Sequence, residues 1–293
     1  MSSQFNKNLS QNQPIIGTTL LEIILVMTAG LILLNILMLS YITIKHNYQQ
    51  QAAINVIKEN GQTVAHILGH DIRLAGYIGC LRLSSDTPIL SHINTTLSFD
   101  KKIQSEKIQY AGNTIDTIVI QHAESAPETL LHTMNTTSNM DLTINHPFYK
   151  GDILLISDCN HVEIFQVKEA TYTTNSQTLT ATTPLKTYFK EKSEISKLVK
   201  NRYFSAITDR ADTYQQPIYA LHKQDIAGKI IQIIDGVDEM IIHYNVQLQN
   251  HLIELDSSQV SDWSKVVSVS MCFLLRHANL KKTWCTDVAL REI

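Results

Sequence analysis

The chain has 293 residues, a formal net charge of −3, ten glycines and six prolines. This length allows one large domain or two small ones, and the slightly acidic charge lacks the basic footprint of proteins that bind nucleic acid or anionic lipid. The low glycine and proline contents exclude collagen-like and low-complexity chains, and the sequence contains no internal repeat of fixed period.

The first predicted element is an apolar stretch at residues 18–44. Between Thr18 and Ile44 only Glu22 is charged at neutral pH, and there is no proline. A helix needs about 20 mostly apolar residues to cross a bilayer, so this segment is long enough to span one. A carboxylate inside such a run costs about 2.5–3.5 kcal/mol near the bilayer centre and less near the interface. Glu22 is therefore expected either to lie near the membrane boundary or to have a partner that offsets this cost.

A short polar leader precedes this stretch. It contains Lys7 and no acid, it ends in Gly17, and Glu22 is the fifth residue after that glycine. The arrangement resembles the class III signal of type IV prepilins and pseudopilins. The resemblance implies that residues 1–17 are a leader, that a prepilin peptidase cuts after Gly17 and methylates Thr18, and that residues 18–44 form the membrane anchor and later the filament core. Thr18 departs from the bulky apolar residue most frequent in the family at this position.

The same resemblance implies that Glu22 pairs with a free amine, either that of a neighbouring subunit or that of its own chain. Opposite charges about 4 Å apart interact more strongly in a low-dielectric setting than in water. A secretory signal would instead have a 7–15-residue apolar core and a small-residue cleavage site. Here the apolar run is longer and is followed by Lys45 and His46. An uncleaved signal anchor stays open as an alternative.

Residues 45–78 are predicted to continue the helix as an amphipathic segment. Their apolar and small residues recur at spacings of three and four, which places them on one stripe. This stripe consists of Ile54, Ile57, Gly61, Val64, Leu68, Ile72 and Ala75. Gly61 inside a helix costs about 0.5–1 kcal/mol relative to Ala, which either a local bend or a close contact would explain.

The end of this segment, KENGQTVAHILGHDIRLAGYIGC, resembles the block that closes the N-terminal helix in PilW-type minor pilins. Asp71 and Arg73 are too close in sequence to face each other on a helix, so they are expected to bond to the head or to the helix end. Gly76 and Gly79 predict the exit of the chain from the helix. The matched positions are Glu59, Asn60, Gly61, Asp71, Arg73, Ala75, Gly76, Tyr77, Gly79 and Cys80.

Residues 79–293 are predicted to form a periplasmic, β-rich head. The stretch GDILLISDC again resembles the PilW pattern, and it reads as a hairpin of strands at 153–156 and 162–167. Lys186–Lys200 is charged and is expected to be an exposed connection. Asp235-Gly236 is a tight-turn dipeptide between strands at 229–234 and 237–246. Further strands are predicted at 114–121, 202–208, 217–222, 263–276 and 283–291, the last resembling the terminal strand of pseudopilins.

Four cysteines follow the membrane segment, and four cysteines allow three complete pairings. Disulfides form in exported regions of proteins. Cys80 ends the predicted helix and Cys159 lies in the turn after a buried strand, so a Cys80–Cys159 bridge would join helix to sheet. A two-residue turn at Ala278-Asn279 would place Cys272 opposite Cys285 within disulfide range. The alternative is that Cys272 is a small buried apolar residue and Cys285 is unpaired.

No motif predicts catalysis, a cofactor or a metal site. His66 and His70 lie four residues apart, but the acid of a zincin is missing and no third ligand is indicated. Asp158, Cys159 and His161 are too crowded along the chain to surround a metal from several directions. No phosphate loop, dinucleotide fingerprint or convergent nucleophile and base is found.

The predicted fold is therefore α+β and pilin-like, with a long N-terminal helix packed on an antiparallel head. The resemblance implies a minor pilin that helps to start or cap a type IV pilus and is anchored by a single pass in the inner membrane. Because the sequence has no legible basic patch, no binding of nucleic acid is predicted. Its expected partners are the prepilin peptidase, the other minor pilins and the major pilin. The alternative is a minor pseudopilin of a type II secretion system, and gene neighbours would separate the two.

We predict cleavage between Gly17 and Thr18 in the native host. The leader is short and polar, and the apolar segment has to survive the cut to act as an anchor. Intact-mass analysis of the purified protein measures the mature N-terminus directly. Gly17→Glu should leave the precursor anchored but uncut, whereas a mature N-terminus at any other residue would contradict the prepilin interpretation.

Overall fold

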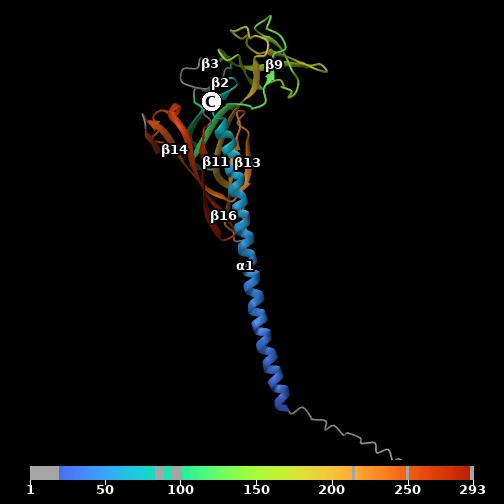
Figure 1. Ribbon diagram of the computed structural model, residues 1–293, viewed down its shortest axis with the longest axis vertical. Coiled ribbons are helices and arrows are strands. Elements are labelled where there is room, and N and C mark those ends of the chain that lie inside the picture. The colour runs from blue at the N-terminus through green and yellow to red at the C-terminus, as the bar shows by residue number, and fades with distance from the viewer. Residues whose placement is uncertain (1–19, 83–88, 94–100, 213–214, 249–250, 291–293) are drawn as a thin grey trace, which may run out of the picture. The chain divides into compact units, whose positions relative to one another are not determined.

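The computed structural model describes residues 20–82, 89–93, 101–212, 215–248 and 251–290 (Figure 1). The chain divides into two compact units, Met1–Ala52 and Ala53–Ile293, and helix α1 (Leu20–Leu74) belongs to both. The described part of the second unit combines the C-terminal portion of α1 with strands of three sheets. One long helix and a mainly antiparallel β-sheet confirm the expected α+β layout.

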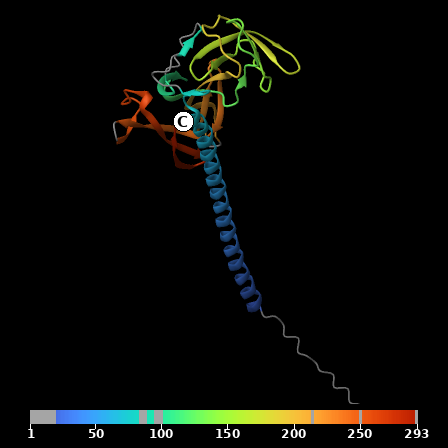
Figure 2. The same cartoon turned by 45° about the horizontal axis from the view of Figure 1, so that its top comes forward.

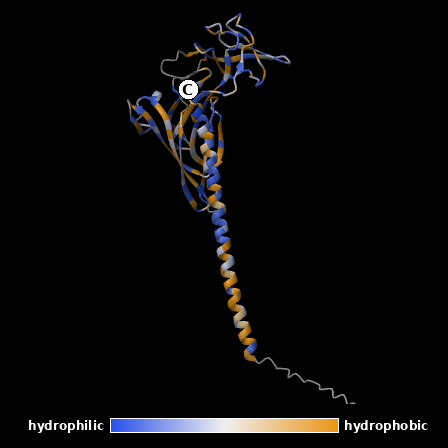
Figure 3. Ribbon diagram, in the orientation of Figure 1, coloured by the Kyte–Doolittle hydropathy of each residue, from blue (hydrophilic) through white to orange (hydrophobic). Residues whose placement is uncertain are grey.

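Helix α1 changes character along its length. Its N-terminal portion is mostly apolar, whereas the portion that belongs to the second unit alternates apolar and polar residues (Figure 3). The predicted stripe is buried in that portion, with Val64, Leu68 and Ile72 completely inaccessible to solvent. Burying such side chains contributes about 1.5–3 kcal/mol each. Ile54 is only half-buried, and Ala53 takes the buried position at this end of the stripe.

The helix ends at Leu74, four residues before the predicted end at Ile78. The cause is Gly76, whose φ of 80° is left-handed and whose N–H donates to the carbonyl of Gln121 over 2.8 Å. The next residues form β1 (Tyr77–Ile78), which pairs with β2 (Leu81–Arg82). Gly79, at φ 84°, completes the exit that the two glycines predict.

Gly61 lies at the closest approach of α1 to the sheet. A Cβ atom at this position would be 2.7 Å from the ring of Trp284 and 3.0 Å from a methyl group of Leu275. Such distances are below van der Waals contact, so only glycine fits without rearrangement. A close contact is therefore the reason for this glycine, and the cost in helix propensity is offset by packing.

The largest sheet is built around one long strand, β11, of 18 residues. The strands of this sheet are β3 (Ile89–Ser91), β4 (Ile103–Tyr110), β5 (Asn113–Ala123), β6 (Glu128–Thr129), β7 (Asn139–Leu142), β8 (Ile153–Ser157), β9 (Val162–Tyr172), β10 (Gln177–Ala181), β11 (Glu194–Ala211), β12 (Pro217–Gln224) and β13 (Ile230–Asp235). Its main path is β13-β12-β11-β8-β9-β10-β7, and β5 also pairs with β11. The predicted strand at 114–121 and the hairpin of β8 and β9 are confirmed.

A second sheet is antiparallel and has the order β15-β14-β16-β17. Its strands are β14 (Val237–Leu248), β15 (His251–Asp256), β16 (Val266–His277) and β17 (Leu280–Ala289). A 3₁₀-helix, η1 (Trp263–Lys265), precedes β16, so this strand begins three residues later than predicted. In Figures 1 and 2 the C-terminal portion of α1 lies against strands of both sheets, and the main apolar core contains residues from all three elements.

Two predictions for the part of the chain after β10 are wrong. Lys186–Lys200 is not an exposed connection, because its second half begins β11 and buries Ile195 and Leu198. Ile195 and Leu198 are three residues apart, so they face opposite sides of the strand, and both sides are covered at this end of β11. Among the strands of six or more residues, β4 and β15 were not predicted, because their polar composition resembles that of loops.

Asp235-Gly236 does not form the predicted tight turn of a hairpin. Strand β13 pairs with β12, and β14 pairs with β15 and β16, so Gly236 carries the chain from one sheet into the other. Its φ is 79°, and a Cβ atom would lie 2.4 Å from the carbonyl oxygen of Arg276. Glycine is required here by both the conformation and the close approach.

We expect Gly61→Ala to destabilise the protein, because the added methyl group overlaps the ring of Trp284. Overpacking of this kind costs about 1–3 kcal/mol, more than the gain in helix propensity. Gly69→Ala is the matched control, since its Cβ would make only ordinary contacts, with Val288 at 3.5 Å and Arg73 at 3.9 Å. Thermal unfolding of the detergent-solubilised protein should show a lower Tm for Gly61→Ala alone, and an equal or higher Tm would refute the close-contact explanation.

Candidate functional site

The residues that the sequence analysis singled out lie in different parts of the chain. Gly17 and Thr18 fall outside the described residues. Glu22 is exposed in the first turn of α1, and the four cysteines lie in the second unit. Four features of the described residues are candidates for a site: the apolar portion of α1, the disulfides, the buried carboxylates and one cavity.

The apolar portion of α1, residues 20–44, exposes its side chains on all sides. The exposed fractions of its large apolar side chains run from 50% for Ile23 to 76% for Leu20. The helix is long and apolar enough to cross a membrane. An apolar surface of this size on a folded protein marks a membrane or protein contact. The surface of residues 20–44 is therefore the first candidate site.

The polar groups on this portion of α1 fall into two classes. The hydroxyl groups of Thr28, Ser40 and Thr43 and the amide of Asn35 each donate to a backbone carbonyl three or four residues earlier, at 2.9 Å. Glu22 has no hydrogen-bond or ion-pair partner among the residues that the structure describes. The helix thus satisfies these aliphatic hydroxyl and amide groups internally, and it does not do so for the Glu22 carboxylate.

The structure joins Cys80 to Cys159 and Cys272 to Cys285, the two pairings expected from the sequence. The first bridge connects the chain just beyond α1 with the turn between β8 and β9, and its Cα atoms lie 5.0 Å apart. The second bridge connects residues directly opposite each other in β16 and β17, at a Cα distance of 4.1 Å. The turn between these strands is the predicted pair Ala278-Asn279.

A buried carboxylate fixes the C-terminal end of α1. Asp71 is 8% exposed, and its Oδ2 accepts hydrogen bonds of 2.6 Å from Asn201 Nδ2 and from the hydroxyl group of Tyr203, both on β11. Its Oδ1 lies 3.3 Å from His70 Nδ1 and 3.8 Å from His122 Nε2. The sequence block had pointed to Asp71, and the structure shows that it bonds to the head.

The protonation of Asp71 is linked to this cluster. Burial would raise its pKa, but interactions with His122, Tyr203 and Asn201 stabilise the carboxylate and lower the pKa far below the usual range. The same burial, together with the charge of Asp71, raises the pKa of Tyr203. The carboxylate is therefore ionised and the phenol neutral at physiological pH. The groups around Asp71 stabilise its carboxylate, so the cluster has a structural role and joins α1 to β11.

Two further carboxylates are completely buried in the head, and both are held by backbone N–H groups. Glu163 accepts from the N–H groups of Lys186 and Thr187 at 2.9 and 2.8 Å, and it lies 2.5 Å from His92 Nε2. Glu128 accepts from the N–H groups of Asn145 and His146. Burial would raise both pKa values, but these hydrogen bonds lower them. Each glutamate anchors a connecting segment to a strand.

Sequence reasoning did not find the partners of these carboxylates. In the sequence, His122 belongs to the run His122-Ala-Glu124-Ser125, which matches no hydrolase motif. In the structure, its Nδ1 donates to the carbonyl of Ala123. Asn201 and Tyr203 could be read only as strand residues. A polar residue inside an otherwise apolar strand was the one available signal, because such a group needs a partner when it is buried.

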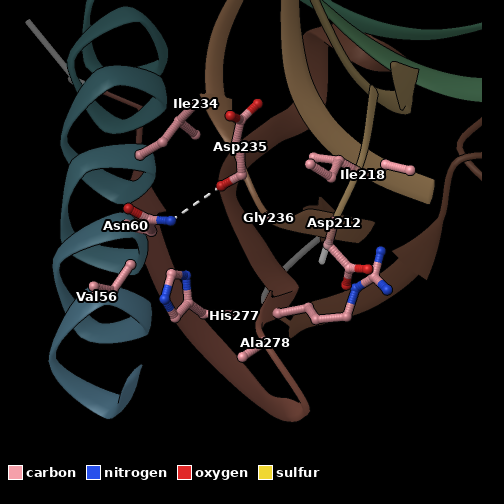
Figure 4. Close-up of a pocket in the computed structure, with 11 residues that line it drawn as sticks. Val56, Asn60, Asp212, Ile218, Ile234, Asp235, Gly236, His277 and Ala278 are labelled. Carbon is pink, nitrogen blue, oxygen red and sulfur yellow. Dashed lines mark hydrogen bonds between the residues drawn. The ribbon is translucent and has the colours of Figure 1, made fainter. Parts of the chain in front are cut away.

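A cavity of about 660 Å³ lies beside α1 in the second unit (Figure 4). The Asn60 side chain points from α1 towards β13 and donates to the carbonyl of Asp235 over 3.0 Å. Asp235 is paired with Arg210, and Arg276 with Asp238. Both ion pairs form within the head, and Asp212 and His277 are the other titratable side chains that line the cavity. Its lining consists of Val56, Asn60, Ala211, Asp212, Ile218, Ile234, Asp235, Gly236, Arg276, His277 and Ala278.

The histidines considered as metal ligands are not gathered into a site. His70 contacts Asp71 and is mostly exposed, and His66 is exposed one turn earlier. His161 and Asp158 lie 3.4 Å apart in the β8–β9 turn, but the third member of this run, Cys159, is in a disulfide. Among the described residues, no group of three or more His, Cys, Asp or Glu side chains is placed to hold a metal ion.

Comparison with models of known protein families gives no match, and comparison with curated protein sequences gives none either. The residues and contacts of this chain therefore carry the functional proposal.

We expect Asp71→Ala to destabilise the head by about 3–5 kcal/mol, since it leaves Tyr203 and Asn201 buried without their acceptor. Arg73→Ala is the control, because Arg73 lies two residues further along α1 and is exposed. The lowered pKa of Asp71 means that its contribution is present above about pH 4, the usual Asp pKa, and is lost as the pH falls further.

Urea unfolding between pH 7 and pH 3 measures both effects. The wild-type protein should lose stability below about pH 4, and Asp71→Ala should lose less over the same range. Equal pH dependence in the two proteins would show that Asp71 is not the carboxylate responsible.

Proposed function

We propose that this chain is a minor pilin that helps to start or cap the assembly of a type IV pilus. In this proposal residues 18–44 anchor the precursor in the inner membrane by a single pass, and residues 79–293 form a head in the periplasm. Cleavage by the prepilin peptidase then frees the N-terminus for contact with the other minor pilins and the major pilin. The protein acts by assembly and not by catalysis.

One observation carries the proposal: a single continuous helix has two portions with different surfaces. Residues 20–44 expose large apolar side chains on every side, whereas the stripe from Ile57 to Ile72 is buried against the β-strands. A helix of an ordinary soluble domain has one apolar stripe and a polar opposite face. An anchor that continues into a folded head requires the combination found here.

Glu22 supports the proposal through its isolation. The side chains of Thr28, Asn35, Ser40 and Thr43 have backbone partners on the helix itself, whereas the carboxylate of Glu22 has none among the described residues. A carboxylate in an apolar run carries a cost that a positively charged group would offset. A free N-terminal amine on a neighbouring subunit, as the resemblance to prepilins implies, is such a group.

The two disulfides support an exported head. All four cysteines are in bridges, and disulfides persist in oxidising compartments such as the periplasm. The Cys80–Cys159 bridge spans 79 residues, and closing a loop of this size stabilises a fold by about 4–5 kcal/mol in the chain-entropy model. Such a bridge suits a head that has to keep its shape outside the cytoplasm.

We expect Glu22→Ala to insert in the membrane and to be cleaved, but to assemble poorly. Removing the charge makes insertion easier, while the neighbouring amine loses its partner. Glu59→Ala is the matched control, because Glu59 is the next acid along α1 and lies in the amphipathic portion. The measurements are membrane fractionation, mature mass, and surface pili together with co-purified pilins. Normal piliation and co-purification in Glu22→Ala would contradict the role given to this residue.

A further inference from the structure

The carboxylate, amide and aliphatic hydroxyl side chains of the apolar portion of α1 lie on one side of the helix. With about 100° between successive residues, all of them fall within an arc of about 140°. The remaining arc of about 220° holds apolar side chains, Gly30 and Tyr41. We call the narrower arc the polar face, and it is defined by Glu22, Thr28, Asn35, Ser40 and Thr43.

The polar face retains unused hydrogen-bonding capacity. Each hydroxyl group donates to its own helix and keeps its acceptor lone pairs. Asn35 uses one N–H group towards the carbonyl of Leu31 and keeps a second N–H group and its Oδ1. All of these side chains are exposed. Facing hydrocarbon, such groups would be unsatisfied, whereas another helix with polar groups can pair with them.

We propose that the polar face packs against the membrane helix of a different subunit, and that the opposite arc is covered by hydrocarbon. The partner helix presents an amine or another basic group at the level of Glu22 and a hydrogen-bonding group at the level of Asn35. A second copy of this chain, parallel and in register, would place Glu22 against Glu22, and like charges repel. This inference rests on the proposed membrane anchoring. It adds that the polar face is the side of the helix that contacts another protein.

Photo-cross-linking of the full-length protein in host membranes tests the orientation. A photo-reactive amino acid is placed at Ile32, in the middle of the polar face, or at Leu34, about 160° away on the opposite arc. The expected result is a several-fold excess of adducts with another protein from Ile32. Equal yields, a higher yield from Leu34, or protein adducts from neither position would overturn the proposal.

Further variants identify the partner and separate this proposal from the anchoring. Asn35→Leu should reduce the adduct from Ile32 several-fold, and Asn35→Gln should largely retain it. An adduct of twice the mass of this chain would overturn the choice of a different subunit. Recovery of the protein outside the membrane fraction would contradict the anchoring itself, whereas anchored protein with equal yields contradicts only the orientation.

Discussion

The structure depends on how one continuous helix has its apolar surface covered. In the second unit the requirement is met within the chain, because the stripe from Ile57 to Ile72 is buried against strands of both sheets. The large apolar side chains of residues 20–44 are exposed in the part of the chain that the structure describes. Since exposed apolar surface is unfavourable in water, this portion needs a membrane or other helices, and the proposed assembly role follows from that need.

The end of α1 is held by three kinds of interaction. The apolar stripe supplies burial, Asp71 supplies hydrogen bonds to Asn201 and Tyr203, and the Cys80–Cys159 bridge fixes the chain just beyond the helix. The carboxylate fixes one position of the helix on the sheet more strictly than the apolar contacts do. In any other register the buried acid would lose its hydration without gaining these hydrogen bonds. Together these interactions prevent the helix from sliding or rotating on the sheet.

Polar groups inside the head have the same organising role at two other places. Glu128 and Glu163 are completely buried, and each binds backbone N–H groups of a connection that has no regular structure there. Connections without ladder hydrogen bonds need such partners when they are covered. The long strand β11 then joins these regions to the part of the head around α1, since it pairs with strands of both.

The sequence by itself determined the elements whose signal is local. The apolar run, the helical stripe, the hairpin of β8 and β9 and the turn at Ala278-Asn279 follow from periodicity, turn chemistry and residue type, and the turn also placed Cys272 opposite Cys285. Only the tertiary structure decided the rest. Gly61 is explained by Trp284, Asp71 by Asn201 and Tyr203, and Gly236 by its passage between sheets. These partners lie far apart along the chain, and pairing between distant segments leaves no local pattern to read.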